Sequence, residues 1–282
     1  MTNKTVVPSP LPIHTKPHSQ PAKTSDAEPS LPKPKLRLHL QDARHAAAAS
    51  FFRFIPDLEA VLNSALAAIV DQLYIPSSSS SNKHKAPASF TPTIPPTRSV
   101  TIILEDFNGV AYTTGTDLDN DHKEIHFSLS YINHVINTNS DALSELKGVL
   151  THELVHCYQH TAPPPASSKD KDIPHPPGGL IEGIADFVRL KAGLVPPHWK
   201  KPTNSKERAE KWDAGYQNTA FFLEWLEDER GRGTVGLVND RLLTRGYVGE
   251  EEGDTDGKGF WRGLFGVGVK ELWEEYGRYL DR

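Results

Sequence analysis

The segment "SDALSELKGVLTHELVHCYQH" (140–160) most constrains how this chain can fold. Its leucines and valines recur at intervals of three and four residues and a Ser-Asp pair can cap its start, so the pattern predicts a helix of about five turns. A helix advances by about 100° per residue, so His152 and His156 lie on one face, one turn apart, with Glu153 beside the first. The fold must therefore present two imidazoles side by side on one helix.

Two imidazoles at this spacing can bind one zinc ion, and Glu153 can polarise a zinc-bound water without being a ligand itself. The alternative is a polar helix that is rich in histidine by composition. The chain holds 13 histidines, and such a pentapeptide arises by chance about 4% of the time. The amphipathic helix around the motif favours the metal site. His160 lies about 12 Å from His152 along the axis, so we expect it at the helix end or cleft rim and not as a ligand.

A third metal ligand must come from elsewhere in the chain. The segment "LIEGIADFVRLKAG" (180–193) predicts a second helix, and its Glu182 and Asp186 share one face. Glu182 can bind zinc while Asp186 accepts the second N–H of a ligating histidine; the alternative is a solvated acidic face. Because the helix is otherwise largely apolar, two carboxylates within it need a reason. His175 and His198, on predicted loops, are weaker ligand candidates.

The remaining pattern predicts an α+β fold, because several strands are followed by helices. Predicted strands cover 35–40, 99–106, 109–115 and 123–135, the last leading into a short helix. Further helical segments cover 46–74, with a helix start at Pro56 and Asp57, and 214–231 and 268–280. Residues 1–35 are rich in proline, serine and lysine, which predicts a disordered tail. We expect one folded domain over 36–282, with low-complexity loops at 75–97 and 161–177.

Composition narrows the function. The net charge of −5 gives no basic field for nucleic acid or an anionic membrane, and no run approaches the roughly 20 apolar residues of a membrane span. The single cysteine, Cys157, excludes an intramolecular disulfide and a cysteine zinc cage. The first residues contain no apolar core of a secretory signal, which favours the cytoplasm.

Three segments resemble one known family. "THELVHCYQH", "GGLIEGIADFVRLKAGLVPPHW" and "DAGYQNTAFFLEWLE" resemble the plant basic secretory protein family, which comprises peptidases of plants and bacteria and is regarded as a gluzincin-type zinc metallopeptidase family. The resemblance covers roughly residues 36–282. It implies Zn²⁺ bound by His152, His156 and Glu182, with Glu153 as general base and Asp186 behind a histidine ligand.

The resemblance also implies a zincin-like fold, in which a small N-terminal mixed sheet and an active-site helix precede a mainly helical C-terminal part. The segment "EIHFSLSYI" (124–132) is expected to be the edge strand that pairs with extended substrate. Members of the family are typically secreted, whereas this sequence shows no signal, so the compartment stays open between the two.

Together these features predict a zinc-dependent peptidase, which we interpret as an endopeptidase, in which Glu153 activates the zinc-bound water. Tyr216 is the first candidate to donate a hydrogen bond to the developing oxyanion and His198 the second; core packing is the alternative role of Tyr216. A non-catalytic binding or defence protein that retains the zincin fold is the alternative function, and the intact Glu153 argues against it. We expect a monomer that acts on peptides or proteins and binds neither nucleic acid nor membrane.

Overall fold

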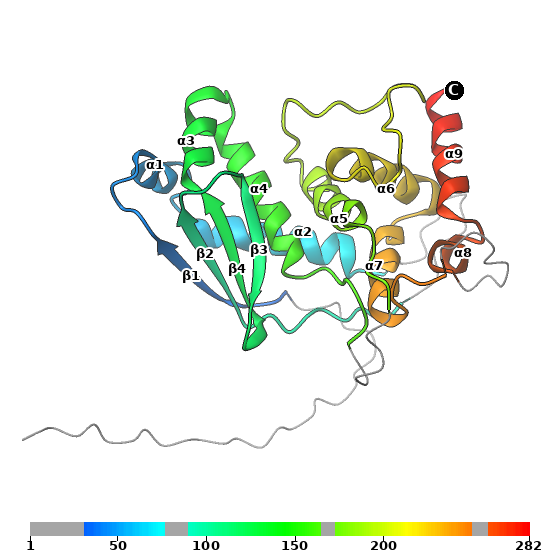
Figure 1. Cartoon of the computed structure of the whole chain (residues 1–282), viewed down its shortest axis with the longest axis horizontal. Coiled ribbons are helices and arrows are strands. Elements are labelled where there is room, and N and C mark those ends of the chain that lie inside the picture. The colour runs from blue at the N-terminus through cyan, green and yellow to red at the C-terminus, as the bar shows by residue number, and fades with distance from the viewer. Residues whose placement is uncertain (1–30, 77–89, 165–172, 250–258) are drawn as a thin grey trace, which may run out of the picture.

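The structure is a computed structural model, and it describes residues 31–76, 90–164, 173–249 and 259–282. Most of the predicted tail at 1–35 therefore lies outside the described residues, as do most of the loop at 75–97 and the middle of the loop at 161–177. The described chain is a mixed α/β fold, with a small sheet on one side and a group of helices on the other (Figure 1). The predicted α+β class is confirmed at this level.

The sheet contains four strands in the order β1-β2-β4-β3. Strands β1 and β4 run parallel to β2, and β3 runs antiparallel to β4, so the sheet is mixed as predicted. The strands are β1 (Lys35–Leu40), β2 (Ser99–Glu105), β3 (Ala111–Thr116) and β4 (Asp119–Ser128).

The prediction that "EIHFSLSYI" forms the edge strand is wrong. Strand β4 pairs with β2 on one side and β3 on the other, so it lies inside the sheet, and the chain turns helical after Ser128. Strand β3 pairs with β4 alone and therefore forms one edge of the sheet. The free edge that faces the helices therefore belongs to β3 (Figure 1).

Each predicted helix is present, and two more lie in the C-terminal half. The predicted helical segment 46–74 forms two helices that meet at Pro56, where a helix start was predicted, and Asp57 caps the second by accepting a hydrogen bond from the Ala60 amide at 2.8 Å. None of the helices in the described part of the chain has the length and apolar character required to span a membrane. The helices are α1 (Ala46–Phe54), α2 (Leu58–Leu73), α3 (Leu129–Thr138), α4 (Ala142–His156), α5 (Gly178–Lys191), α6 (Tyr216–Arg230), α7 (Thr234–Thr244), α8 (Phe260–Phe265) and α9 (Val269–Leu280).

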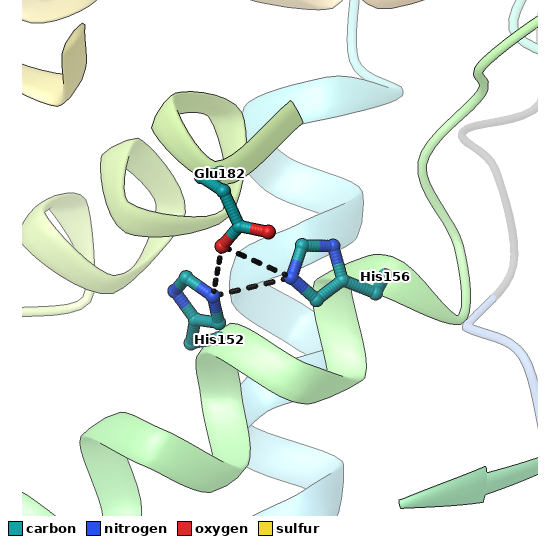
Figure 2. A group of neighbouring side chains, drawn as sticks. All are labelled: His152, His156 and Glu182. Carbon is teal, nitrogen blue, oxygen red and sulfur yellow. Dashed lines mark hydrogen bonds and ion pairs between the residues drawn. The ribbon is translucent and has the colours of Figure 1, made fainter. Parts of the chain in front are cut away.

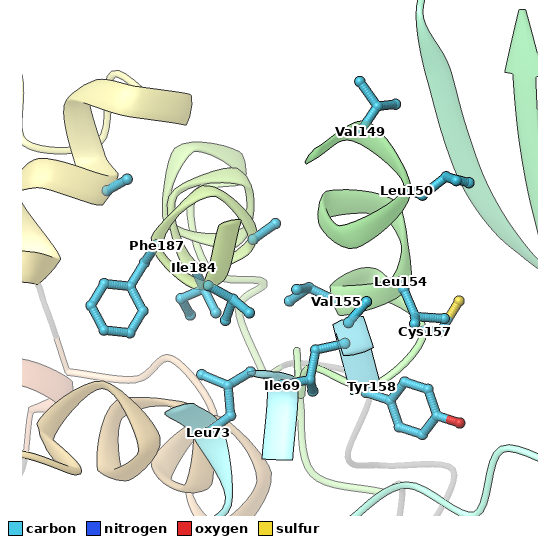
Figure 3. Packing of buried hydrophobic residues seen from close by; sticks show 14 of the residues in the cluster. Ile69, Leu73, Val149, Leu150, Leu154, Val155, Cys157, Tyr158, Ile184 and Phe187 are labelled. Atoms are coloured by element: carbon cyan, nitrogen blue, oxygen red, sulfur yellow. The ribbon is translucent and has the colours of Figure 1, made fainter. Parts of the chain in front are cut away.

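Helix α4 lies between the sheet and the C-terminal helices (Figure 1). Its side chains Leu150 and Leu154 are fully buried in the core cluster together with Ile69 of α2 and Ile184 of α5 (Figure 3). Burial of each such side chain contributes about 1.5–3 kcal/mol. This burial fixes the rotation of α4 about its axis, and the remaining polar face, which carries the histidines, is directed away from the core.

Two glycines allow α5 and the chain before α6 to approach closely. A Cβ atom at Gly183 would overlap the side chain of Thr219 in α6, and one at Gly179 would overlap the backbone oxygen of Asp213. Larger residues at either position would push α6 away from α5. The glycines therefore bring the first residue of α6, Tyr216, beside the polar face of α5.

Candidate metal centre

Three predicted ligands converge where α4 and α5 pack together. His152 and His156 of α4 and Glu182 of α5 direct their ligand atoms toward one point (Figure 2). The two Nε2 atoms are 3.1 Å apart, and Oε2 of Glu182 lies 3.0 Å from His152 Nε2 and 3.7 Å from His156 Nε2. Four ligands around zinc, with bonds of about 2.0–2.1 Å, would lie about 3.3 Å from one another. The observed triangle has the size that such an ion requires.

Asp186 fixes the tautomer of the first histidine. Its Oδ1 lies 2.6 Å from Nδ1 of His152, and both side chains are buried. The carboxylate accepts the Nδ1–H, so Nε2 is the ring nitrogen that is left to face the triangle and bind a metal ion. The structure thus places Asp186 behind His152, where it was predicted, and Glu182 in the triangle itself.

Gln159 is placed to do the same for the second histidine. Nε2 of its side-chain amide lies 2.6 Å from Nδ1 of His156, and its Oε1 is buried without a hydrogen-bond partner among the described residues. Rotation of the amide by 180° brings Oε1 to the imidazole, where it accepts the Nδ1–H and gains the missing partner. Nε2 of His156 then also presents a lone pair to the triangle. The donor set fits a metal ion.

The charges around the triangle favour a cation at its centre. Burial disfavours the charged form of His152, but hydrogen bonds to Asp186 and Glu182 together outweigh burial and raise its pKa to about 9. Burial favours the neutral form of Glu182, yet its hydrogen bonds to His152 and His156 lower its pKa to about 2. The carboxylates thus require positive charge between them, which a proton or a metal ion can supply.

Glu153 lies outside the triangle, as its predicted role requires. It is buried in the wall of the same cleft, and its Oε2 lies 2.7 Å from the hydroxyl oxygen of Thr113. Thr113 is on β3, the edge strand that faces the helices. A contact between strand and helix therefore holds the carboxylate beside the triangle.

The triangle opens into a cleft of about 750 Å³ between β3 and helices α4 to α6. Tyr216 borders it with its ring stacked on that of His152, the centroids being 6.0 Å apart. Its φ of +47° is the one positive value among the described non-glycine residues, and such strain concentrates at functional sites. The negative charge of Glu182, followed by burial, raises the pKa of the tyrosine, so its hydroxyl keeps its proton. Tyr216 is exposed to the cleft and is not a core residue.

The other histidines considered in the sequence lie in different places relative to the cleft. His198 borders the cleft, whereas His175 is exposed and does not line it. His160 lies beyond the end of α4, is buried, and donates from Nε2 to the backbone oxygen of Thr93 at 2.8 Å. It is therefore outside the triangle, and it is a buried structural residue and not a residue of the cleft rim.

Sequence reasoning missed two residues of the site, Thr113 and Gln159. The alternation of side chains along the strand, which directs Thr113 inward and Tyr112 outward, could be predicted from the sequence. The contact of Thr113 with Glu153, forty positions away, could not. Gln159 follows His156 by three residues, a spacing at which helical side chains meet, and that signal was available in the sequence.

The fold and the triangle define a mixed α/β protein with a candidate metal centre in an open cleft. The chain belongs to the family described as peptidases of plants and bacteria (BSP), because the family model matches residues 33–276, which is most of the chain. The resemblance predicted from the sequence is thereby confirmed, and the family description names peptidase activity. No curated protein and no solved structure matches the chain.

Proposed function

We propose that this protein is a zinc-dependent endopeptidase. The observation that carries the proposal is the triangle of His152, His156 and Glu182, with the carboxylate of Glu153 beside it in the same open cleft. The family description supplies the reaction class, peptide hydrolysis. Two imidazoles and one carboxylate are a donor set typical of catalytic zinc.

His152, His156 and Glu182 would hold the ion, and the hydrogen bonds of Asp186 and Gln159 would orient the two imidazoles. When bound, zinc supplies Lewis-acid chemistry, which lowers the pKa of water and polarises a carbonyl group. The isosteric substitution of a carboxylate ligand should therefore weaken the binding of metal as well as activity.

Glu153 would act as the general base and then as the general acid. Its carboxylate would take a proton from the attacking water and pass it to the nitrogen of the leaving amine. Thr113 holds one carboxylate oxygen at 2.7 Å and leaves the other for the reaction. Tyr216, which keeps its phenolic proton, would donate a hydrogen bond to the oxygen that gains negative charge, and His198 is the second candidate for that role.

We also infer a zincin-like arrangement, in which the substrate lies along the sheet edge. That edge is β3 and not the segment 124–132, because β4 is paired on both sides. Residues 110–113 border the cleft, and an extended peptide could add to the unpaired backbone of β3 as a further strand. Such a substrate would pass directly over Glu153.

The rival function is a non-catalytic binding or defence protein that retains this fold. A scaffold without catalysis has no need of a carboxylate held beside the triangle, so the contact between Thr113 and Glu153 supports the enzyme. The test is metal content together with hydrolysis of casein, with and without chelator, for the wild type and Glu153→Gln. An enzyme loses hydrolysis in the variant while zinc stays bound. Zinc without hydrolysis in the wild type would favour the rival.

A further inference from the structure

Helices α4 and α5 make polar contacts at three successive positions along their length, which we call levels. The proposed metal chemistry uses two of the three levels. Glu182 meets the histidine pair, and Asp186 meets His152. One turn further along α5, Arg189 forms an ion pair with Glu145 of α4, Nη2 to Oε2 at 3.0 Å. The third level lines the same cleft as the first two. Its position beside the reactive centre suggests a role in the recognition of substrate.

The third level lies within reach of the residue next to the cleaved bond. Glu145, Val149, His152 and His156 follow one face of α4 at intervals of four, three and four residues. The rise of 1.5 Å per residue places Val149 about 5 Å and Glu145 about 10 Å from His152 along the axis. An extended peptide advances about 3.3 Å per residue. A side chain adjacent to the bond could therefore point into this end of the cleft.

The polar groups at this end already have partners. Glu145 accepts the Tyr131 hydroxyl on Oε1 at 2.9 Å and Arg189 on Oε2. Arg189 donates from Nε to the backbone oxygen of Leu194 at 3.0 Å, and its guanidinium lies 5.4 Å from the ring centroid of Trp199. The side chains of the pair are only 4% and 8% exposed. The Arg189–Glu145 pair, which forms the floor of this end of the cleft, therefore carries no net charge, and both oxygens of Glu145 already have partners.

The floor is also held in place. A Cβ atom at position 148 would lie 2.5–2.7 Å from three guanidinium atoms of Arg189, so Gly148 provides the space in which the guanidinium rests against α4. The walls around the floor include the apolar side chain of Val149 and the aromatic rings of Tyr131 and Trp199. A charged substrate side chain would lose its hydration here without meeting a free counter-charge. An apolar side chain would gain from burial.

We propose that this end of the cleft is a subsite for a large apolar side chain, leucine or phenylalanine, of a peptide substrate. The side chain belongs to one of the two residues that flank the cleaved bond. The Arg189–Glu145 pair forms the floor and excludes charged side chains because each partner neutralises the other. This subsite rests on the proposed peptidase function and adds the substrate class.

The first experiment measures the preference of the wild-type protein. Mass spectrometry of a casein digest identifies a cleaved bond, and quenched fluorescent peptides then vary each flanking position among leucine, phenylalanine, alanine, glutamate and lysine. At one of the two positions, kcat/KM for leucine and phenylalanine should exceed that for glutamate and lysine by about 10- to 100-fold. Equal rates, or a preference for charge at both positions, would overturn the subsite.

The second experiment removes one charge from the floor. Glu145→Gln keeps the shape of the side chain but leaves the charge of Arg189 uncompensated, so the ratio of kcat/KM for glutamate over leucine should rise by about 10-fold or more. The matched control is Glu271→Gln, which breaks a surface ion pair with Arg262 and should leave the ratio at the wild-type value. An unchanged ratio in a folded Glu145→Gln protein would contradict the proposal.

A third variant guards against loss of folding, since Glu145 is buried. Val149→Ala removes part of the wall and enlarges the subsite. The kcat/KM ratio of tryptophan over leucine peptides should therefore rise by about 10-fold. If no peptide is cleaved, the peptidase function fails, and the fluorescence anisotropy of the same labelled peptides then tests the subsite by binding alone. Tighter binding of leucine than of glutamate peptides would support the subsite; equal binding would reject it.

Discussion

The hydroxyl oxygen of Thr113 lies 2.7 Å from Oε2 of Glu153 and 3.0 Å from the backbone oxygen of the same residue. Cys157 N–H bonds to the carbonyl of Leu154, so the backbone oxygen of Glu153 lacks the usual helical amide at this end of α4. One hydroxyl hydrogen thus faces two acceptors, and the carboxylate oxygen is the nearer of the two. This side chain links the edge strand to the proposed base.

Loss of this hydroxyl should slow the reaction without releasing the metal. Thr113→Val keeps the shape of the side chain, and removal of a hydrogen bond to a charged group is worth about 1.5–3 kcal/mol, so kcat should fall by about 10- to 100-fold. Thr113→Ser restores the hydroxyl and should recover most of kcat, with KM and zinc content close to wild type in both variants. Full activity of the valine variant would show that Glu153 needs no such support.

The two pairs of residues that build the site could be predicted because the spacing within each pair is local. The separation of His152 and His156 on one helix follows from helical geometry alone, and the same holds for Glu182 and Asp186 on the next helix. What joined the two pairs was the expectation that carboxylates in an apolar helix need partners. The structure supplies the partners at 3.0 Å and 2.6 Å.

The order of the strands could not be predicted in this way. Hydrophobic alternation shows that a segment is a strand but not which neighbours it has, because pairing depends on contacts far apart in sequence. The interior position of β4 and the edge position of β3 therefore emerged only from the fold. Helices α7 and α8 were missed for a different reason. Helix α8 has only 6 residues, and α7 contains Gly236 and several β-branched residues, which have low helix propensity.

The two acids should differ in their effect on metal affinity. Glu182→Gln removes a ligand from the triangle, whereas Asp186→Asn alters only the hydrogen bond to His152. Loss of the outer residue, Asp186, should lower zinc affinity by about 10- to 100-fold. Loss of the ligand, Glu182, should lower it further. Zinc competition with a fluorescent chelator measures both. The control is Glu105→Gln, which alters an acid bonded to His126 away from the triangle. A larger loss in Asp186→Asn would reverse the two roles.

The close approach of α5 and α6 gives a stability test with a built-in control. A Cβ at Gly183 would overlap Thr219, while one at Gly178 would have no atom within 4 Å. Gly183→Ala should therefore lower the free energy of unfolding by about 1–3 kcal/mol. Gly178→Ala should leave it unchanged or raise it by up to about 1 kcal/mol, because alanine has the higher helix propensity. Urea denaturation measures the free energy of unfolding of both variants. Equal values for the two would mean that α6 can move away from α5 without cost.

Buried His160 should make stability depend on pH. Burial lowers its pKa below 6.5, more strongly than its hydrogen bond to Thr93 raises it. The unfolded chain therefore binds a proton that the folded chain resists, so the contribution to stability is fully present above about pH 6.5 and is lost as the pH falls below that value. The free energy of unfolding, measured with chelator at about pH 7.5 and about pH 5.5, should decrease more in the wild type than in His160→Gln. Exposed His134 provides the control, since His134→Gln should reproduce the wild-type decrease. An equal decrease in His160→Gln would show that the folded protein accommodates the charged imidazole.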